Sequence, residues 1–130
     1  MKFLEENSQL MDHFLHPRNV GKIDKADGIG NVGNATCGDI MEISLKVKNN
    51  IIEDIKFHTY GCAAAISSTS VLTELVKGKT IEKALEISNK KIRDILGEMP
   101  KYKYHCTVLA EQALKAAIED YKKKKNAVKK

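Results

Sequence analysis

Five residues that can bind a metal ion lie at three separate places in the sequence: Cys37, Asp39, Cys62, His105 and Cys106. Thiolates together with an imidazole and a carboxylate suit zinc, or iron with sulfide, and suit calcium or magnesium poorly. The cysteines are separated by 25 and 44 positions, whereas structural zinc sites usually carry their cysteines in close pairs. We therefore expect a metal site that only the fold can assemble.

Each candidate also has a plainer interpretation. Cysteine packs as a small hydrophobic residue, so Cys62 or Cys106 taken alone is more often part of a core than a ligand. His105 is a candidate only because it adjoins Cys106. The other histidines are assigned to the surface or to packing: His13, His16 and His58. The residues by themselves thus predict a metal or thiol site without fixing its occupant.

Length and composition predict a single soluble globular domain. The chain has 130 residues, of which 42% are hydrophobic, and this is enough to bury one core. Residues 1–9 lack the apolar run of a secretion signal, and no segment approaches the length that a membrane span needs. Three cysteines cannot all pair, which fits a reducing compartment. We expect a cytoplasmic protein that does not enter a membrane.

The positive charge is concentrated at the C-terminal end. The net charge is +5, but residues 122–130 contribute +6, so residues 1–121 carry 16 basic and 17 acidic side chains. A nucleic-acid-binding domain would be expected to carry a basic face on its folded part, with stacking aromatic residues nearby. The sequence therefore argues against nucleic acid as a partner. The Lys-rich tail is expected to be a solvated helix end.

The N-terminal part predicts one helix followed by a loop. Residues 3–14 favour a helix that Pro17 stops, with an apolar stripe made of Phe3, Leu10, Met11, Phe14 and Leu15. Residues 18–36 are rich in Gly, Asn and Asp, a composition that favours turns with at most one short edge strand.

The middle of the chain predicts a β-hairpin. Residues 41–48 alternate between apolar and polar side chains, as a strand with one buried face does. Asn49 and Asn50 suit a tight turn, and a second antiparallel strand then continues the apolar face through Ile51, Ile55 and Phe57. Two such strands bring their far ends together. Asp39 and Cys62 are thus expected at the same edge.

The second half of the chain predicts helices. Cys62 is expected to open a helix whose apolar stripe is Ala65, Thr69, Leu72 and Val76. Residues 80–96 predict two short helices with a break near Ser88. The last helix is expected to start at Cys106, because apolar positions follow it at helical steps: Ala110, Leu114, Ala117 and Tyr121.

Four segments carry motifs in a characteristic order and spacing: His13-Phe14-Leu15-His16-Pro17-Arg18-Asn19-Val20-Gly21, Ala35-Thr36-Cys37-Gly38-Asp39, Thr59-Tyr60-Gly61-Cys62, and His105-Cys106 followed by Leu109-Ala110-Glu111. In these motifs the sequence resembles the U-type iron-sulfur cluster assembly scaffolds, the IscU family, also found as the N-terminal domain of NifU. The resemblance spans nearly the whole chain.

The resemblance implies an α+β fold in which helices pack against a small antiparallel sheet of about three strands. It also implies that a 2Fe-2S cluster is assembled on the protein and then transferred. The implied ligands are the three cysteines, with Asp39 or His105 as the fourth, and zinc is possible in the same site. A scaffold of this kind is a carrier and not an enzyme.

The resemblance further implies several protein partners. A cysteine desulfurase would deliver persulfide sulfur, with Cys106 as the expected acceptor. A ferredoxin-type donor would supply electrons, and apo iron-sulfur proteins would receive the cluster. The protein itself is expected to be a monomer or a weak homo-oligomer.

The segment before His105 departs from the family. Many members carry Leu-Pro-Pro-Val-Lys there for a dedicated Hsp70 chaperone, whereas this chain has Met99-Pro100-Lys101-Tyr102-Lys103. The resemblance therefore does not extend to a chaperone-driven release step. Pro100 blocks regular structure and its polar neighbours suit a surface, so we expect this segment to contact partners.

Two alternatives retain a metal but differ in function. One is a zinc-holding sulfurtransferase that accepts persulfide from a desulfurase, and the other is a structural zinc domain. The zinc-dependent branch of the superfamily carries an insertion that is missing between Gly97 and Cys106. This difference favours the scaffold.

Overall fold

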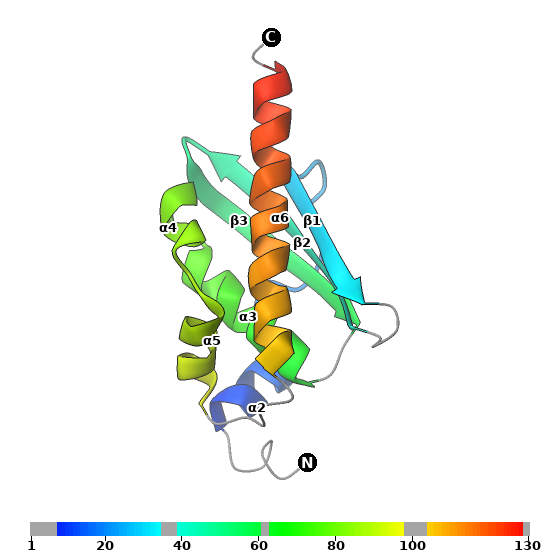
Figure 1. Ribbon diagram of the computed structural model, residues 1–130, viewed down its shortest axis with the longest axis vertical. Helices are drawn as coiled ribbons and strands as arrows, with labels where there is room; N and C mark the ends of the chain where they lie inside the picture. Colours follow the sequence, from blue (N-terminus) through cyan, green and yellow to red (C-terminus); the bar gives the residue numbers. More distant parts are fainter. Residues whose placement is uncertain (1–7, 35–38, 61–62, 98–103, 129–130) are drawn as a thin grey trace.

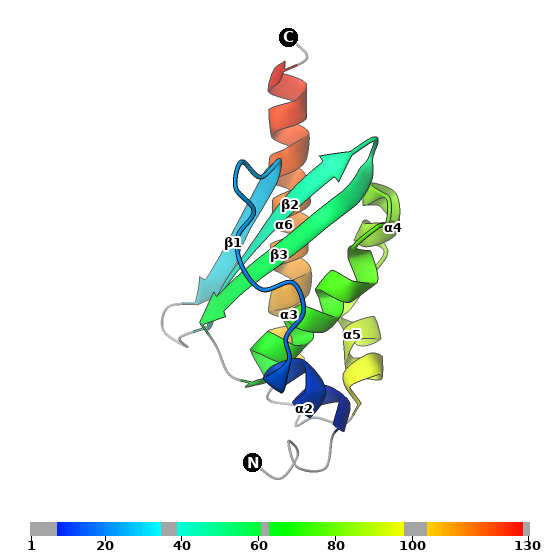
Figure 2. The ribbon, with the colours of Figure 1, turned by 180° about the vertical axis from the view of Figure 1, so that it is seen from behind.

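The structure, a computed structural model, describes residues 8–34, 39–60, 63–97 and 104–128. Its elements are helix α2 (Ser8–Leu15), strands β1 (Gly28–Asn34), β2 (Asp39–Lys48) and β3 (Ile51–Tyr60), and helices α3 (Ala63–Val76), α4 (Ile81–Leu85), α5 (Asn89–Leu96) and α6 (Tyr104–Val128). The strands form an antiparallel sheet in the order β1-β2-β3. Helices α3 and α6 pack on one face of it, as the two opposite views show (Figures 1 and 2). The predicted α+β class is confirmed.

The β2–β3 hairpin has the predicted turn, but its pairing is irregular next to that turn. Asn49 and Asn50 both have positive φ values, 54° and 65°, as a tight two-residue hairpin turn requires. Next to the turn the pairing shifts, because Lys46 lies opposite Asp54 while Val47 lies opposite Ile52. The extra residue in β3 reverses which side chains face the core near the turn.

The expectation that Ile51 belongs to the buried face is therefore wrong. Ile51 is 40% exposed, whereas its neighbour Ile52 is completely buried. Farther from the turn the predicted face is correct, since Ile55 and Phe57 are buried.

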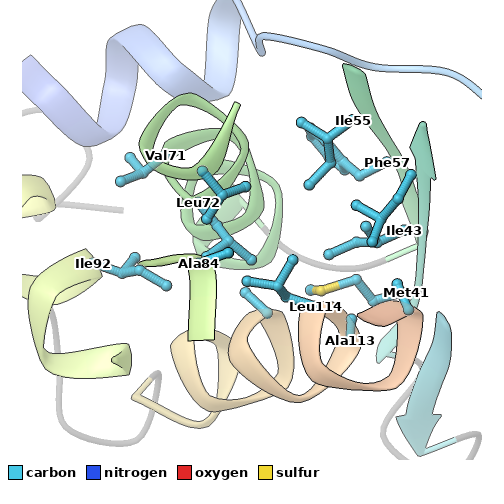
Figure 3. Packing of buried hydrophobic residues seen from close by; sticks show 14 of the residues in the cluster. Met41, Ile43, Ile55, Phe57, Val71, Leu72, Ala84, Ile92, Ala113 and Leu114 are labelled. Atoms are coloured by element: carbon cyan, nitrogen blue, oxygen red, sulfur yellow. The ribbon is translucent and has the colours of Figure 1, made fainter. Parts of the chain in front are cut away.

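The core lies between the sheet and the helices. Figure 3 shows side chains of β2 and β3 facing side chains of α3 and α6: Met41, Ile43, Ile55 and Phe57 on the sheet, Leu72 on α3, and Ala113 and Leu114 on α6. The predicted stripe of α3 is also buried, namely Ala65, Thr69, Leu72 and Val76. Within the described residues, no helix has the length and apolarity that crossing a membrane would need.

The helices after α3 begin close to where the sequence predicts. The break near Ser88 is confirmed, because Thr80 and Ser88 are the N-caps of α4 and α5 and accept hydrogen bonds from backbone amides. Helix α6 starts at Tyr104, two residues before the expected start at Cys106. Its continuation through residues 122–125 is exposed.

Strand β1 is an edge strand in a segment where the sequence favours turns with at most one short edge strand, and it lies unusually close to α6. A Cβ atom added to Gly28 would lie 2.3 Å from the carbonyl oxygen of Ala117, and one added to Gly30 would lie 2.4 Å from that of Ala113. Real Cβ atoms do not approach other atoms so closely, so the strand backbone rests directly on the helix backbone. The backbone amide of Ile29 also donates a hydrogen bond of 2.8 Å to Asp120 Oδ2 on α6.

Gly30→Ala tests this contact. The added methyl group meets backbone atoms, which cannot move aside as a side chain can, so we expect the free energy of unfolding to fall by about 1–3 kcal/mol. Thermal or urea unfolding measures the change. The matched control is Asn31→Ala on the same strand, because Asn31 is exposed. Equal stability of the two variants would contradict the close packing.

Candidate metal centre

The structure describes the five predicted ligands to different extents. Cys106 is fully described and lies in the first turn of α6. Asp39 begins β2 and His105 is the second residue of α6, and for both the description covers the backbone. Cys37 and Cys62 lie outside the described residues, as do the partner-contact candidates Met99, Pro100, Lys101, Tyr102 and Lys103.

The strand ends that flank these ligands lie together at one end of the sheet. Asn34, the last residue of β1, is paired with Asp39, the first residue of β2. The next residue of β2, Ile40, is paired with Tyr60 at the end of β3. The backbone of Asp39 therefore lies close to the point where β3 leads toward Cys62, as predicted for the two outer ends of the hairpin.

The first turn of α6 lies at the same end of the molecule. Figures 1 and 2 both place the starts of α3 and α6 next to each other, near the end of β3. Ala64 and Ala65 at the start of α3 belong to the same buried cluster as Cys106. Among the described residues no group of three or more His, Cys, Asp or Glu side chains is placed to hold a metal ion. The backbone thus brings together the elements that carry or adjoin the candidates.

Cys106 is completely buried, and neighbouring residues fasten its helix to α5. The guanidinium of Arg93, on α5, lies 4.6 Å from the ring centre of Tyr104. Asn89, the first residue of α5, donates from its backbone amide to Glu111 Oε1 at 2.6 Å. Tyr104 precedes Cys106 on α6 and Glu111 follows it, so α6 is tied to α5 on both sides of the thiol.

Helix α2 is held against α3 by a buried histidine. His13 Nδ1 lies 2.7 Å from Ser70 Oγ, and the same oxygen accepts a hydrogen bond of 2.9 Å from the backbone amide of Arg18. The Ser70 hydroxyl can therefore donate to Nδ1 of a neutral ring. His13 Nε2 lies 3.4 Å from Glu74 Oε1. The assignment of His13 to packing is supported, but nothing in the sequence indicates Ser70, which is 57 positions away.

Burial holds the pKa of His13 below its ordinary value, because a charged ring loses its hydration there. The charge of Arg18 acts in the same direction, and those of Glu74 and Asp12 oppose it. Arg18 donates to Asp12 Oδ2 at 2.6 Å, and this hydrogen bond lowers the pKa of Asp12. The neutral imidazole is thus the form that fits the contact between α2 and α3.

The predicted stripe of α2 is wrong at its last position. Leu10 is buried, as expected, but Leu15 is 59% exposed. Five residues of an α-helix turn a side chain by roughly 140° from its starting direction, so Leu15 cannot share the face of Leu10. His13, three residues after Leu10, occupies that face instead.

The comparisons with known proteins agree with the fold and with the predicted family. Residues 5–128 match the family model described as the NifU-like N-terminal domain. The chain belongs to this family. It is 55% identical over 122 residues to the iron-sulfur cluster assembly scaffold protein IscU 1 of Archaeoglobus fulgidus, covering 94% of this chain and 80% of that protein.

A second curated relative and a solved structure also match most of the chain. The chain is 49% identical to the iron-sulfur cluster assembly scaffold protein IscU of Escherichia coli, covering 93% of this chain and 97% of that protein. The crystal structure of a NifU-like N-terminal protein from Brucella abortus has a TM-score of 0.71 at 18% identity, covering 91% of this chain and 94% of that one. The structural likeness shows the shared fold, and the predicted family resemblance is confirmed.

The pH dependence of stability tests the role of His13. Because its folded pKa lies below the unfolded value of about 6.5, its contribution is fully present above that pH. The contribution is lost as the pH falls further, since the unfolded chain then binds the proton more readily. We expect His13→Asn, which keeps an acceptor near the Nδ1 position, to lose stability less steeply between pH 7.5 and pH 5 than the parent, as thermal unfolding would show.

The exposed neighbour His16 provides the control. His16→Asn makes the same substitution at an exposed position, and its slope of stability against pH is the reference for that of His13→Asn. A parent-like slope in His13→Asn would show that His13 does not cause the loss.

Proposed function

We propose that this protein is a scaffold on which an iron-sulfur cluster is assembled and from which the cluster passes to other proteins. The observation that carries the proposal is the 49–55% identity, over more than nine-tenths of the chain, to proteins named as iron-sulfur cluster assembly scaffolds. The arrangement of the start of β2, which carries Asp39, and the start of α6, which carries Cys106, is consistent with this proposal. A zinc sulfurtransferase is not favoured by these relatives.

The proposed ligands are the thiolates of Cys37, Cys62 and Cys106, with Asp39 or His105 in the fourth position. Thiolates are the usual ligands of iron-sulfur units, and the chain has no further cysteine to supply a fourth. An oxygen or nitrogen ligand there would bind iron less strongly than a thiolate. Such a site suits a cluster that must leave, and we infer a 2Fe-2S cluster with zinc as a competing occupant.

The proposed chemistry requires a sulfur donor and an electron donor. A thiolate at Cys106 would attack the outer sulfur of a desulfurase persulfide, which forms a new S–S bond on Cys106 and releases the donor thiolate. Reducing two such sulfurs to sulfide takes four electrons, of which two ferrous ions supply two. A ferredoxin-type protein would supply the remaining two. Residues 99–103 are proposed to contact these partners.

Anaerobic reconstitution tests the function. The protein is incubated with ferrous iron, cysteine and a cysteine desulfurase, and then mixed with an apo-ferredoxin. A scaffold should develop visible absorption, contain iron and acid-labile sulfide, and lose both as the acceptor gains its cluster. A colourless zinc protein, or a cluster that is never transferred, would refute the proposal.

The three thiols can be tested one at a time. Cys37→Ser, Cys62→Ser and Cys106→Ser should each bind much less cluster in the same reconstitution, because a serine oxygen is a poor replacement for a soft thiolate. Thermal unfolding of each variant shows whether the fold survives. Full cluster yield from a folded variant would remove that thiol from the proposed ligand set.

Asp39→Ala tests the fourth ligand. If the carboxylate binds iron during assembly and then yields to an acceptor thiolate, the variant should transfer its cluster more slowly and hold it longer. If Asp39 only caps the turn before β2, the variant should instead lose stability and bind less cluster. Asp24→Ala, an exposed carboxylate in the segment before β1, is the control. Parent-like transfer by Asp39→Ala would exclude the ligand role.

A further inference from the structure

The proposed function places a contradictory demand on Cys106. A thiol that receives sulfur and binds iron must be reachable, yet Cys106 is completely buried and belongs to the main hydrophobic cluster. Its position in the first turn of α6 suggests how both can be true. The first turn of a helix has backbone amides without partners in the helix, and helix ends open locally at much lower cost than the whole fold.

The first turn of α6 contacts α5 through the ring of Tyr104. Tyr104 is the first residue of α6, it is half-buried, and its ring packs against the core cluster. The guanidinium of Arg93 covers the ring at 4.6 Å from its centre. Arg93 is in turn oriented by a hydrogen bond from its Nη1 to Asn89 Oδ1, one turn earlier on α5.

Helix α5 is also bound to α6 at a second point. The backbone amide of Asn89 is bound by Glu111 Oε1, and Lys115 Nζ lies 3.2 Å from the other oxygen of the same carboxylate. Glu111 lies seven residues after Tyr104, about two helical turns. Helix α5 is therefore joined to the second turn of α6 through Glu111, and to the first turn through the contact between Arg93 and Tyr104.

We propose that Arg93 is a positioning residue for Cys106, which acts through Tyr104 by holding the first turn of α6 closed over the thiol. The proposal rests on the proposed function in one respect, that Cys106 is a ligand that partners must reach. The contact between Arg93 and Tyr104 sets the fraction of time for which Cys106 is accessible, while the rest of the fold stays intact.

The expected size of the effect follows from the type of contact. A guanidinium over an aromatic ring at a partly exposed position contributes enough to change an opening equilibrium by about three- to tenfold. Loss of the contact should therefore make Cys106 accessible about three to ten times as often. An effect on the unfolding of the whole domain should be small, because the core side chains shared by the sheet, α3 and α6 are unchanged.

Alkylation under native conditions measures the accessibility of each thiol. The metal-free full-length chain is treated with iodoacetamide for increasing times, denatured and digested with trypsin, and the extent of labelling is read by mass spectrometry. Cleavage after Lys103 and Lys115 places Cys106 on its own peptide, residues 104–115, apart from the other two cysteines. Cys37 and Cys62 thus serve as internal references in the same sample.

Four variants separate positioning from general stability. Arg93→Gln removes the cation and Tyr104→Leu removes the ring but keeps apolar bulk, so both should label Cys106 about three to ten times faster than the parent. Tyr104→Phe keeps the ring and should behave as the parent does. Lys91→Gln removes a cation from an exposed position on the same helix and is the matched control.

Two results would overturn the proposal. One is a parent-like labelling rate of Cys106 in Arg93→Gln or in Tyr104→Leu. The other is an equal acceleration at all three cysteines together with a lower thermal midpoint, which would mean that the contact only stabilises the whole domain. The assay contains no iron or sulfur donor, so its outcome is independent of whether cluster assembly itself is observed.

Discussion

The contact between the backbones of β1 and α6 fixes the position of the longest helix on the sheet. Gly28 and Gly30 leave no side chain between strand and helix, so the two approach more closely than any other residue would permit. The amide of Ile29 is held by Asp120 of α6, which satisfies part of the open edge of β1. Because α6 is fixed along its middle, its first turn lies at a definite place, beside the end of the sheet where β2 begins.

The β2–β3 hairpin fixes the position of the strand ends at the candidate site. Its tight turn and its bulge both lie at the end far from the candidate site, near Ile52, so the irregular pairing is over before the strands reach Ile40 and Tyr60. Regular pairing at that end places the start of β2 and the end of β3 side by side. The pairing of β2 with β3 thus positions Asp39, and the packing of α6 on β1 positions Cys106. These two sets of contacts are separate.

Sequence patterns predicted the elements but not the contacts between them. Alternation of apolar residues was sufficient for β2 because one of its faces is buried, whereas the bulge that exposes Ile51 leaves no trace in such a pattern. In the sequence, the glycines of β1 suggested turns. The structure explains why a strand carries them, because side chains at Gly28 and Gly30 would collide with the backbone of α6. For the site, the motifs predicted Cys106 as a candidate ligand, and the apolar residues after it predicted its helix. The Arg93–Tyr104 contact joins residues whose types and spacing carry no signal by themselves.

Helix α6 contributes both to the hydrophobic core and to the candidate site. The side chains that join the sheet to the helices, such as Ile43, Leu72 and Leu114, lie well inside their elements, where each is held by neighbours on several sides. Cys106 belongs to the same cluster, but it lies within one turn of the end of α6, where backbone hydrogen bonds are fewest. Opening that turn would displace Tyr104, Cys106 and Thr107 and leave the side chains in the middle of the core packed. On the proposal that Cys106 is a ligand, its place at a helix end would let the thiol become exposed at a lower cost than unfolding of the whole domain.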